Sequence, residues 1–164
     1  MSLTRTIKHW ILSPIPVKYS FPTEALKDIE SLIASSEEKT SSEFLVIVER
    51  SLPMSYVRRG APDSQRAQML FGKYRCWDTE DNNGVLIYLN LSDHGIEIVL
   101  DRAAARLFTQ TELDNIVLRM GKLFREKKWV EGIKLALDAL TPKLSEKFPN
   151  KPVDNPLPNT PVLL

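Results

Sequence analysis

The chain of 164 residues has few of the side chains that build disulfides, zinc sites or strongly charged interfaces. Its single cysteine, Cys76, excludes an intrachain disulfide and fits a reducing compartment. One cysteine and two histidines, His9 and His94, are too few for a standard structural zinc site. The formal net charge is only +1, whereas domains that bind nucleic acid usually carry a strong positive excess. We therefore expect no nucleic-acid partner.

Long hydrophobic runs are also missing. No stretch reaches the roughly 20 apolar residues that a membrane-spanning helix needs. The apolar segment 10–17 is short and contains Pro14 and Pro16, so it does not fit a secretory signal. We expect a cytoplasmic protein with no transmembrane segment.

A second interpretation places the protein at the membrane periphery, through an amphipathic N-terminal helix. Apolar and basic residues lie beside one another in this helix, namely Ile7, Trp10, Ile11, Leu12, Arg5 and Lys8. Without such a contact, we expect the apolar side chains of this helix to cover one edge of the domain.

Three hydrophobic segments, residues 43–50, 84–91 and 95–102, have the length and composition of β-strands. The first two are almost continuously apolar, which is typical of strands buried on both faces. In the third, apolar and polar residues alternate, so one of its faces is only half covered. The four-residue turn at 92–95 joins the last two strands into an antiparallel hairpin.

Amphipathic helices are predicted before, between and after these strands, because apolar residues recur there at helical spacing. The predicted helices cover residues 23–40, 63–77, 109–128 and 129–148. Asp63 or Ser64 is the expected cap of the second helix, and Thr109 with Glu112 forms a capping box for the third. The last helix is interrupted at Pro142 and resumes after it.

This order of elements predicts a three-layer α/β/α sandwich around a small mixed sheet. A right-handed crossover makes the first two strands parallel, and the hairpin adds an antiparallel third strand. We assign residues 1–20 to an N-terminal extension, 21–148 to the α/β domain and 149–164 to a proline-rich tail. The tail either packs on the domain or hangs free.

Two stretches carry a resemblance to a known family, NNGVLIYLNLSDHGIEIVLDRAAARLFTQTELDNIV and FREKKWVEGIKLALDAL. In the first, the Asn83-Gly84 pair directly precedes a Val-Leu strand, and a T-x-x-E helix start follows at Thr109. In the second, a helix opens on an aromatic and a glycine, Trp129 and Gly132. Together with FLVIVERSLP, this order resembles the TPM domain over residues 21–148, in the small bacterial form without a membrane anchor.

The resemblance implies the α/β sandwich fold of the TPM domain. It also implies a choice of activities, because the family has been linked to phosphatase activity, to calcium binding and to the quality control of membrane proteins. We therefore expect a protein partner that is associated with a membrane.

Polar residues gather at two points of the predicted hairpin, before its first strand and after its second. An antiparallel hairpin sets the start of one strand beside the end of the next, so these residues are predicted neighbours: Asp81, Asn82, Asn83, Asp101 and Arg102. Glu43 lies at the start of the parallel first strand and is expected to approach them.

Converging carboxylate and amide oxygens suit a hard divalent cation such as Ca²⁺ or Mg²⁺. The predicted metal ligands are Glu43, Asp81, Asn82 and Asp101. Two simpler interpretations stay open. Residues 81–84 form a turn whose side chains bond their own backbone while Gly84 eases the geometry, and Asp101 with Arg102 is an ion pair that caps residues 103–107.

A metal-dependent phosphatase is the alternative function, with Asp101 and Arg102 as candidate catalytic residues and Asp81 beside them. Phosphate-ester hydrolysis needs an activated water or a nucleophile, together with positive charge on the phosphoryl oxygens. The sequence has no glycine-rich phosphate loop and no nucleophile elbow. Cys76 is expected in the core, and both histidines are expected at the surface.

We therefore predict a TPM-like interaction module that binds a divalent cation and a membrane-associated partner. A local basic patch at Arg58, Arg59 and Arg66 is predicted as well. Such a patch is either a solvated face or a contact for an anionic lipid or a partner.

Overall fold

The computed structural model of the chain describes residues 3–12, 17, 21–151 and 157–164. The elements in these residues follow the order α1 (Leu3–Leu12), α2 (Thr23–Glu37), β1 (Phe44–Glu49), α3 (Met54–Arg58), α4 (Asp63–Lys73), β2 (Val85–Asn90), β3 (Gly95–Leu100), α5 (Arg102–Ala105), α6 (Gln110–Arg125), α7 (Trp129–Lys147) and β4 (Val162–Leu163). No helix in these residues is both long enough and apolar enough to cross a membrane.

The sheet has the strand order β3-β2-β1-β4, with β1 parallel to β2 and β2 antiparallel to β3. Both pairings agree with the prediction from the sequence. The proline-rich tail adds β4, which runs parallel to β1 on its free side. The backbone N–H of Leu164 donates to the Val48 carbonyl at 2.9 Å, and Leu157 is buried, so the tail packs on the domain.

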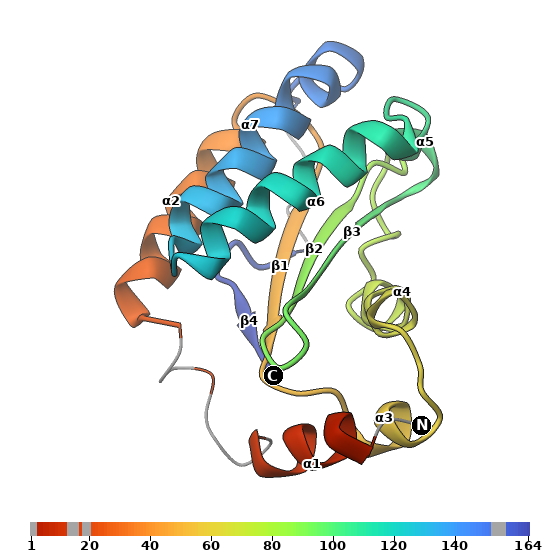
Figure 1. Cartoon of the computed structure of the whole chain (residues 1–164). Coiled ribbons are helices and arrows are strands. Elements are labelled where there is room, and N and C mark those ends of the chain that lie inside the picture. The colour runs from red at the N-terminus through yellow and green to blue at the C-terminus, as the bar shows by residue number, and fades with distance from the viewer. Residues whose placement is uncertain (1–2, 13–16, 18–20, 152–156) are drawn as a thin grey trace.

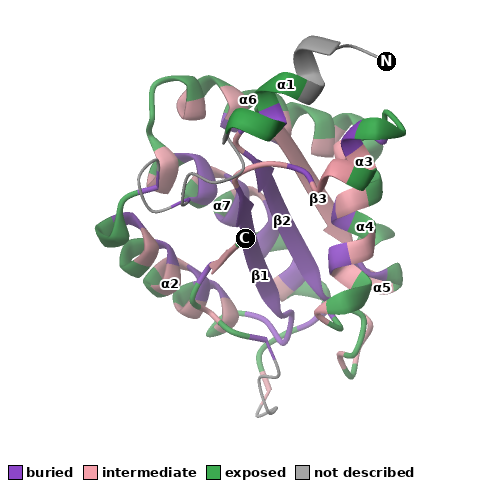
Figure 2. Cartoon of the chain, turned by 90° about the horizontal axis from the view of Figure 1, so that it is seen from below, coloured by how far each residue is buried: buried purple, intermediate pink, exposed green. Residues whose placement is uncertain are grey.

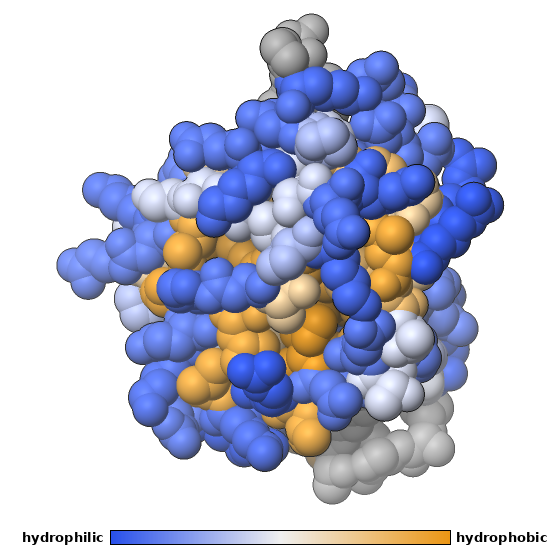
Figure 3. Space-filling model, turned by 90° about the horizontal axis from the view of Figure 1, so that it is seen from above, coloured by the Kyte–Doolittle hydropathy of each residue, from blue (hydrophilic) through white to orange (hydrophobic). Residues whose placement is uncertain are grey.

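The sheet lies between two layers of helices, as Figure 1 shows: α2, α6 and α7 cover one face and α4 covers the other. Strands β1 and β2 are buried along their whole length, whereas the edge strand β3 is half-buried, as Figure 2 shows. This arrangement confirms the predicted three-layer sandwich. Figure 3 shows that hydrophilic side chains dominate the surface seen from above, with hydrophobic ones visible between them.

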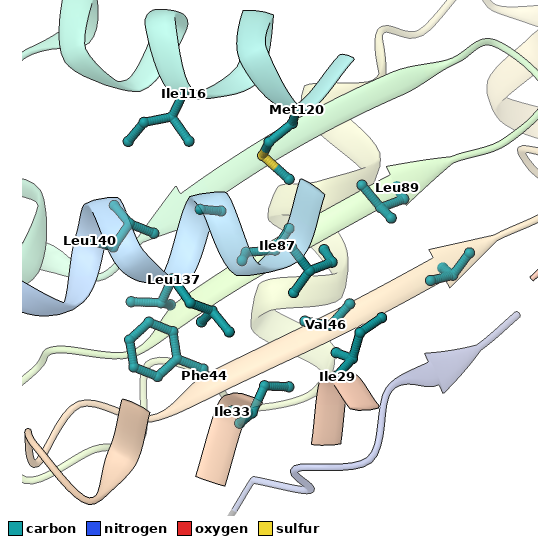
Figure 4. Close-up of a cluster of buried hydrophobic side chains, with 14 of the residues drawn as sticks. Ile29, Ile33, Phe44, Val46, Ile87, Leu89, Ile116, Met120, Leu137 and Leu140 are labelled. Carbon is teal, nitrogen blue, oxygen red and sulfur yellow. The ribbon is translucent and has the colours of Figure 1, made fainter. Parts of the chain in front are cut away.

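The larger core lies between the sheet and the three helices α2, α6 and α7. It contains apolar side chains that alternate along β1 and β2 and meet the apolar stripes of the helices (Figure 4), among them Phe44, Val46, Ile87, Ile33, Met120 and Leu137. A smaller core under α4 is built from the alternate strand residues, including Leu45 and Leu86, which pack against Ala67 and Leu70 of α4. Period-two alternation therefore divides each strand between the two cores.

The helix ends follow the sequence signals at some sites and depart from them at others. The Thr109 and Glu112 capping box is formed, with the Thr109 N–H donating to the Glu112 carboxylate at 2.8 Å. The predicted cap at Asp63 or Ser64 is wrong, because the carboxylate of Asp63 instead accepts a hydrogen bond from the Asn90 amide at 2.6 Å. Helix α7 also runs through Pro142 without the predicted interruption.

The prediction of a surface position for His9 is wrong. Its side chain is buried, and its Nδ1 accepts a hydrogen bond from the Leu52 N–H at 3.0 Å. Its Nε2 lies 3.0 Å from a carboxylate oxygen of Asp93. These contacts tie α1 to the end of β1 and to the hairpin turn. Ile7, Trp10 and Ile11 are exposed, so they do not cover the domain edge as expected. The side chains of Arg5 and Leu12 lie outside the described residues.

Arg66 lies over the Tyr56 ring as Arg59 does, but its side chain is largely buried and is not part of a solvated face. Its guanidinium forms a two-pronged ion pair with Glu49, at 2.9 Å through Nε and 2.5 Å through Nη2. The Tyr88 hydroxyl donates to the same carboxylate at 2.6 Å. This pairing satisfies a carboxylate that β1 buries at the end of the sheet opposite to Glu43.

Gly84, directly before β2, packs against the backbone of the chain after α4. A Cβ atom at this position would lie 1.9 Å from the backbone carbonyl oxygen of Cys76. We predict that Gly84→Ala destabilises the fold by about 3 kcal/mol, because a backbone atom cannot move aside as a flexible side chain does. Urea unfolding measures this change in the free energy of unfolding.

Gly72→Ala is the matched control for that measurement. Gly72 lies in α4, and a Cβ atom there would meet no atom within 4 Å. The control should be neutral or slightly stabilising, since alanine favours a helix more than glycine does. Equal stabilities for the two variants would contradict the proposed contact.

Candidate functional site

The predicted polar residues lie at one end of the sheet, where β1 and β2 begin and β3 ends; we call this end the rim. The backbone N–H of Asp101 donates to the Gly84 carbonyl at 2.9 Å, and that of Ala103 donates to the Asn82 carbonyl at 3.0 Å. The N–H of Val85 donates to the Glu43 carbonyl at 2.8 Å. The segments before β1, before β2 and after β3 are therefore neighbours, as the hairpin argument predicts.

The strand registers place the side chains of the rim. Val85 pairs with Phe44 on one side and with Leu100 on the other. Continuing both registers by one residue sets Glu43, Gly84 and Asp101 in one row, and their positions face the core under α4. Gly84 has no side chain, and the carbonyl of Cys76 packs against it between the two acids. Both Glu43 and Asp101 are 5% exposed.

Three buried oxygen atoms at the rim accept no hydrogen bond from any described residue. They are Oε2 of Glu43, Oδ1 of Asn83 and Oδ2 of Asp101. Buried polar atoms in folded proteins almost always have a partner, so three exceptions at one end of a sheet are unusual. Acceptor atoms of this kind are available to a ligand, an ion or a water molecule.

The second oxygen of Asp101 has a structural role. Asp101 is the N-cap of α5, and its Oδ1 accepts a hydrogen bond from the Arg102 N–H at 2.7 Å. The Arg102 side chain lies 3.7 Å from the same oxygen and also contacts Oδ1 of Asn82. The ion-pair and capping interpretation is therefore confirmed, and Oδ2 stays unused.

The predicted turn before β2 is present. Its hydrogen bonds are accepted by Thr79 and not by the acidic and amide side chains themselves. The Thr79 hydroxyl accepts from the Asn83 N–H at 2.9 Å, and its carbonyl accepts from the Asn82 N–H at 3.2 Å. Asn82 holds the left-handed backbone conformation with φ of 52°. Gly84 does not, so its requirement comes from the Cys76 carbonyl and not from turn geometry.

Asp81 is paired more fully than the sequence suggested. Its carboxylate accepts a hydrogen bond from the Ser41 hydroxyl at 3.0 Å and lies 2.9 Å from the Lys151 amine. The Lys151 hydrogen bond is the main reason that the pKa of Asp81 is lowered. The Asn83 amide donates to the same Ser41 hydroxyl at 3.2 Å, so Ser41 links Asp81 to Asn83.

The four predicted ligands share the rim but do not meet at one point. Within the part of the chain that the structure describes, no three histidine, cysteine, aspartate or glutamate side chains are grouped to hold a metal ion. The sequence did not indicate four groups at the rim: the Ser41 hydroxyl, the side-chain oxygen of Asn83 as a metal ligand, the Cys76 carbonyl and the Lys151 amine. Ser41 precedes a strand, which was a usable signal, whereas nothing in the tail sequence marks Lys151 as a partner of the rim.

Cys76 is a core residue, as predicted, although it lies beyond the end of α4 and not within a helix. The left-handed conformation of Arg75, with φ of 57°, ends the helical path before it. Burial raises the pKa of the Cys76 thiol to about 12, so a nucleophilic thiolate is not populated near neutral pH. His94 is exposed in the hairpin turn, also as predicted.

Glu43 has the most perturbed carboxyl group at the rim. Its pKa is raised from 4.5 to about 7, first because of burial and then because Glu37 lies nearby. A backbone hydrogen bond from Leu157 in the tail opposes that rise. The protein therefore keeps, near neutral pH, a partly protonated acid at a site that a cation would favour in its charged form.

These features define the class of protein: an α/β/α sandwich with a polar rim where its hairpin begins and ends. The family model of the TPM domain matches residues 20–143, so the chain belongs to the TPM domain family. The solution structure of BA42 protein from the psychrophilic bacterium Bizionia argentinensis has a similar fold, with a TM-score of 0.74. The two chains are 24% identical over 88% of this chain and 95% of that one. The comparison with curated proteins gives no match.

We predict that Glu43→Gln stabilises the metal-free protein at pH 8. Because the folded pKa is raised, the folded state binds a proton more tightly than the unfolded state between pH 4.5 and about 7. The contribution of Glu43 to stability is therefore present below pH 4.5 and is lost as the pH rises through 7. The expected gain at pH 8 is about 2 kcal/mol, and glutamine should remove this part of the pH dependence.

Denaturant unfolding at pH 5 and pH 8 in the presence of a chelator measures the effect. Glu131→Gln, an exposed acid on α7, is the control and should leave the pH dependence unchanged. A Glu43→Gln protein that is less stable than wild type at pH 8 would contradict the raised pKa.

Proposed function

We propose that this TPM domain is an accessory module that binds one divalent cation, Ca²⁺ or Mg²⁺, at the rim and works with a membrane-associated partner. The observation that supports the cation is the set of three buried oxygen atoms without a hydrogen-bond donor, on Glu43, Asn83 and Asp101. The four ligands inferred from the sequence, Glu43, Asp81, Asn82 and Asp101, all lie at this rim.

Calcium fits this chemistry better than a transition metal. It takes six to eight oxygen ligands in flexible geometry, including carboxylates, amide and backbone carbonyls, and water. The rim offers each of these protein groups, with the Cys76 carbonyl beside Gly84 as the backbone ligand. The Glu43 and Asp81 side chains would have to rotate to converge, because no three acidic side chains of the described residues are grouped to hold a metal ion.

Lys151 is the built-in competitor of the proposed cation. Its amine lies 2.9 Å from the carboxylate of Asp81 and 3.1 Å from that of Glu80. The positive charge of this lysine, on the proline-rich tail, neutralises carboxylates that a divalent ion would otherwise bind. Displacing it costs an exposed ion pair, which is worth little in water. Cation binding and the position of the tail are therefore proposed to be coupled.

Calorimetric titration with CaCl₂ tests this proposal. We predict saturable binding to the wild type, with affinity at least tenfold weaker in Asp101→Asn, which removes one negative charge and keeps the α5 cap acceptor. Lys151→Met should bind severalfold tighter, since the competing amine is gone. Asp138→Asn on α7, which pairs with Lys134 far along the chain from the rim segments, is the control.

The absence of binding to both the wild type and Lys151→Met would overturn the cation site. The same samples address a phosphatase, the second candidate, which is supported by the exposed Arg102 beside Asp101. Turnover of para-nitrophenyl phosphate with Mg²⁺ that disappears in Arg102→Ala would favour the enzyme. Calcium binding without turnover favours the accessory module.

The proposed membrane contact lies on α1. Ile7, Trp10 and Ile11 are 47%, 71% and 55% exposed, although each is apolar and could have been buried. His9 on the inner side of the same helix holds it on the domain through Leu52 and Asp93. An apolar helix face that is fixed outward is typical of peripheral contact with a lipid surface.

Sedimentation with lipid vesicles tests the α1 surface. We predict binding to vesicles that contain anionic lipid, reduced at least fivefold in Trp10→Ser. Trp77→Ser, which removes a half-exposed tryptophan outside α1, is the matched control and should bind as wild type does. Wild-type protein that stays in the supernatant with every vesicle would contradict a direct lipid contact.

A further inference from the structure

A cavity lies at the end of the sheet opposite to the rim. It has a volume of about 220 Å³ and is lined by the β2–β3 hairpin, the C-terminal part of α6 and the first residue of α7. No residue of the cation proposal lines it. The two sites can therefore be tested separately.

The interior of this cavity is apolar and aromatic. Its lining includes Leu89, Ile96, Phe124 and Trp129. The Phe124 and Trp129 rings are 5.2 Å apart between centroids, and Phe21 packs on Trp129 at the same distance, so two aromatic rings hold the indole in place. An apolar cavity of about 150 Å³ is enough to hold benzene. This cavity is therefore large enough for one six-membered ring with a short substituent.

Two cationic or protonatable side chains, Arg125 and His94, are among the residues that line this apolar space. Both are exposed, and neither makes an ion pair or hydrogen bond with any residue that the structure describes. No aspartate or glutamate is among the lining residues. The guanidinium is always charged and presents a planar fork of donors that matches a carboxylate.

Gly121 gives this cavity part of its volume. It lies inside α6, where glycine is a poorer helix former than alanine. Packing does not require it, because a Cβ atom at Gly121 would meet only the Ile96 side chain, at an ordinary contact distance of 3.7 Å. The helix therefore carries an unfavourable residue at a position whose methyl group would project beside the cavity.

We propose that this cavity is a binding site for a small aromatic monocarboxylate. The ring enters between Phe124, Trp129 and Ile96, and the carboxylate stays at the edge with Arg125 and His94. An apolar pocket with a few convergent polar groups is the usual form of a small-molecule site. Size selects a single ring, and the unpaired guanidinium selects an anion over a neutral or cationic ligand.

Titration monitored by ¹H–¹⁵N correlation spectra tests the site, with 3-phenylpropionate and the neutral 3-phenylpropanol as the two probes. We expect saturable shifts at Gly95, Gly121 and the Trp129 indole, with the acid bound at least fivefold more tightly than the alcohol. Arg125→Gln should remove that preference and leave the alcohol affinity unchanged. Lys122→Gln, on the same helix but outside the lining, should bind as wild type does.

Gly121→Ala gives an independent test, because it should raise the melting temperature while weakening both probes at least threefold. Gly72→Ala is the matched control, since it should leave probe binding unchanged. Three results would overturn the proposal: no saturable shift with either probe, an acid preference that survives Arg125→Gln, or unchanged affinity in a folded Gly121→Ala protein. Because CaCl₂ binding is measured at the other end of the sheet, failure here leaves the cation site standing.

Discussion

The contact between Gly84 and the Cys76 carbonyl is the constraint on which the rim depends. It brings the chain after α4 against the first residues of β2, with space for a hydrogen atom and not for a side chain. The registers of β1 and β3 then set Glu43 and Asp101 on either side of this point. Strand pairing, and not any local motif, therefore assembles the candidate site.

The rim holds three of the five buried side-chain atoms without a hydrogen-bond partner in the described residues, the other two being His9 Nε2 and Thr141 Oγ1. At the other end of β1, Glu49 is just as buried, yet Arg66 and Tyr88 satisfy its carboxylate. Glu43 and Asp101 each keep an oxygen without a donor. Glu43 and Glu49, at the two ends of β1, are thus equally buried and differ only in their hydrogen-bond partners. Unpaired buried oxygens lower stability, and sites that keep them are commonly the ones that bind something.

The sequence was sufficient for the fold because each element carries a strong local signal. Continuous apolar runs give β1 and β2, the short turn gives the hairpin, and the capping box at Thr109 gives the start of α6. The same signals also predict which strand ends meet, so the rim could be located in advance. Element ends were less predictable, as at α4, where Asp63 turns to Asn90 instead of capping its own helix.

The pairing of individual side chains could not be predicted, because it depends on residues that are distant in sequence. Nothing near His9 indicates that Leu52 and Asp93 will bury it, and nothing near Asp81 indicates Lys151. The cavity beside Trp129 is likewise made by the hairpin and two helices together. Patterns along the chain give elements and faces, whereas sites arise where three or more elements converge.

Paramagnetic broadening by Mn²⁺ tests the central claim most directly, because it reports the position of a bound divalent ion in solution without any substitution. Substoichiometric Mn²⁺ should broaden the amide resonances of Asn83, Gly84 and Asp101 first and leave those of Gly60 and Gly95 sharp. Uniform weak broadening, or selective broadening at residues away from the rim, would show that strand pairing has not built a cation site there.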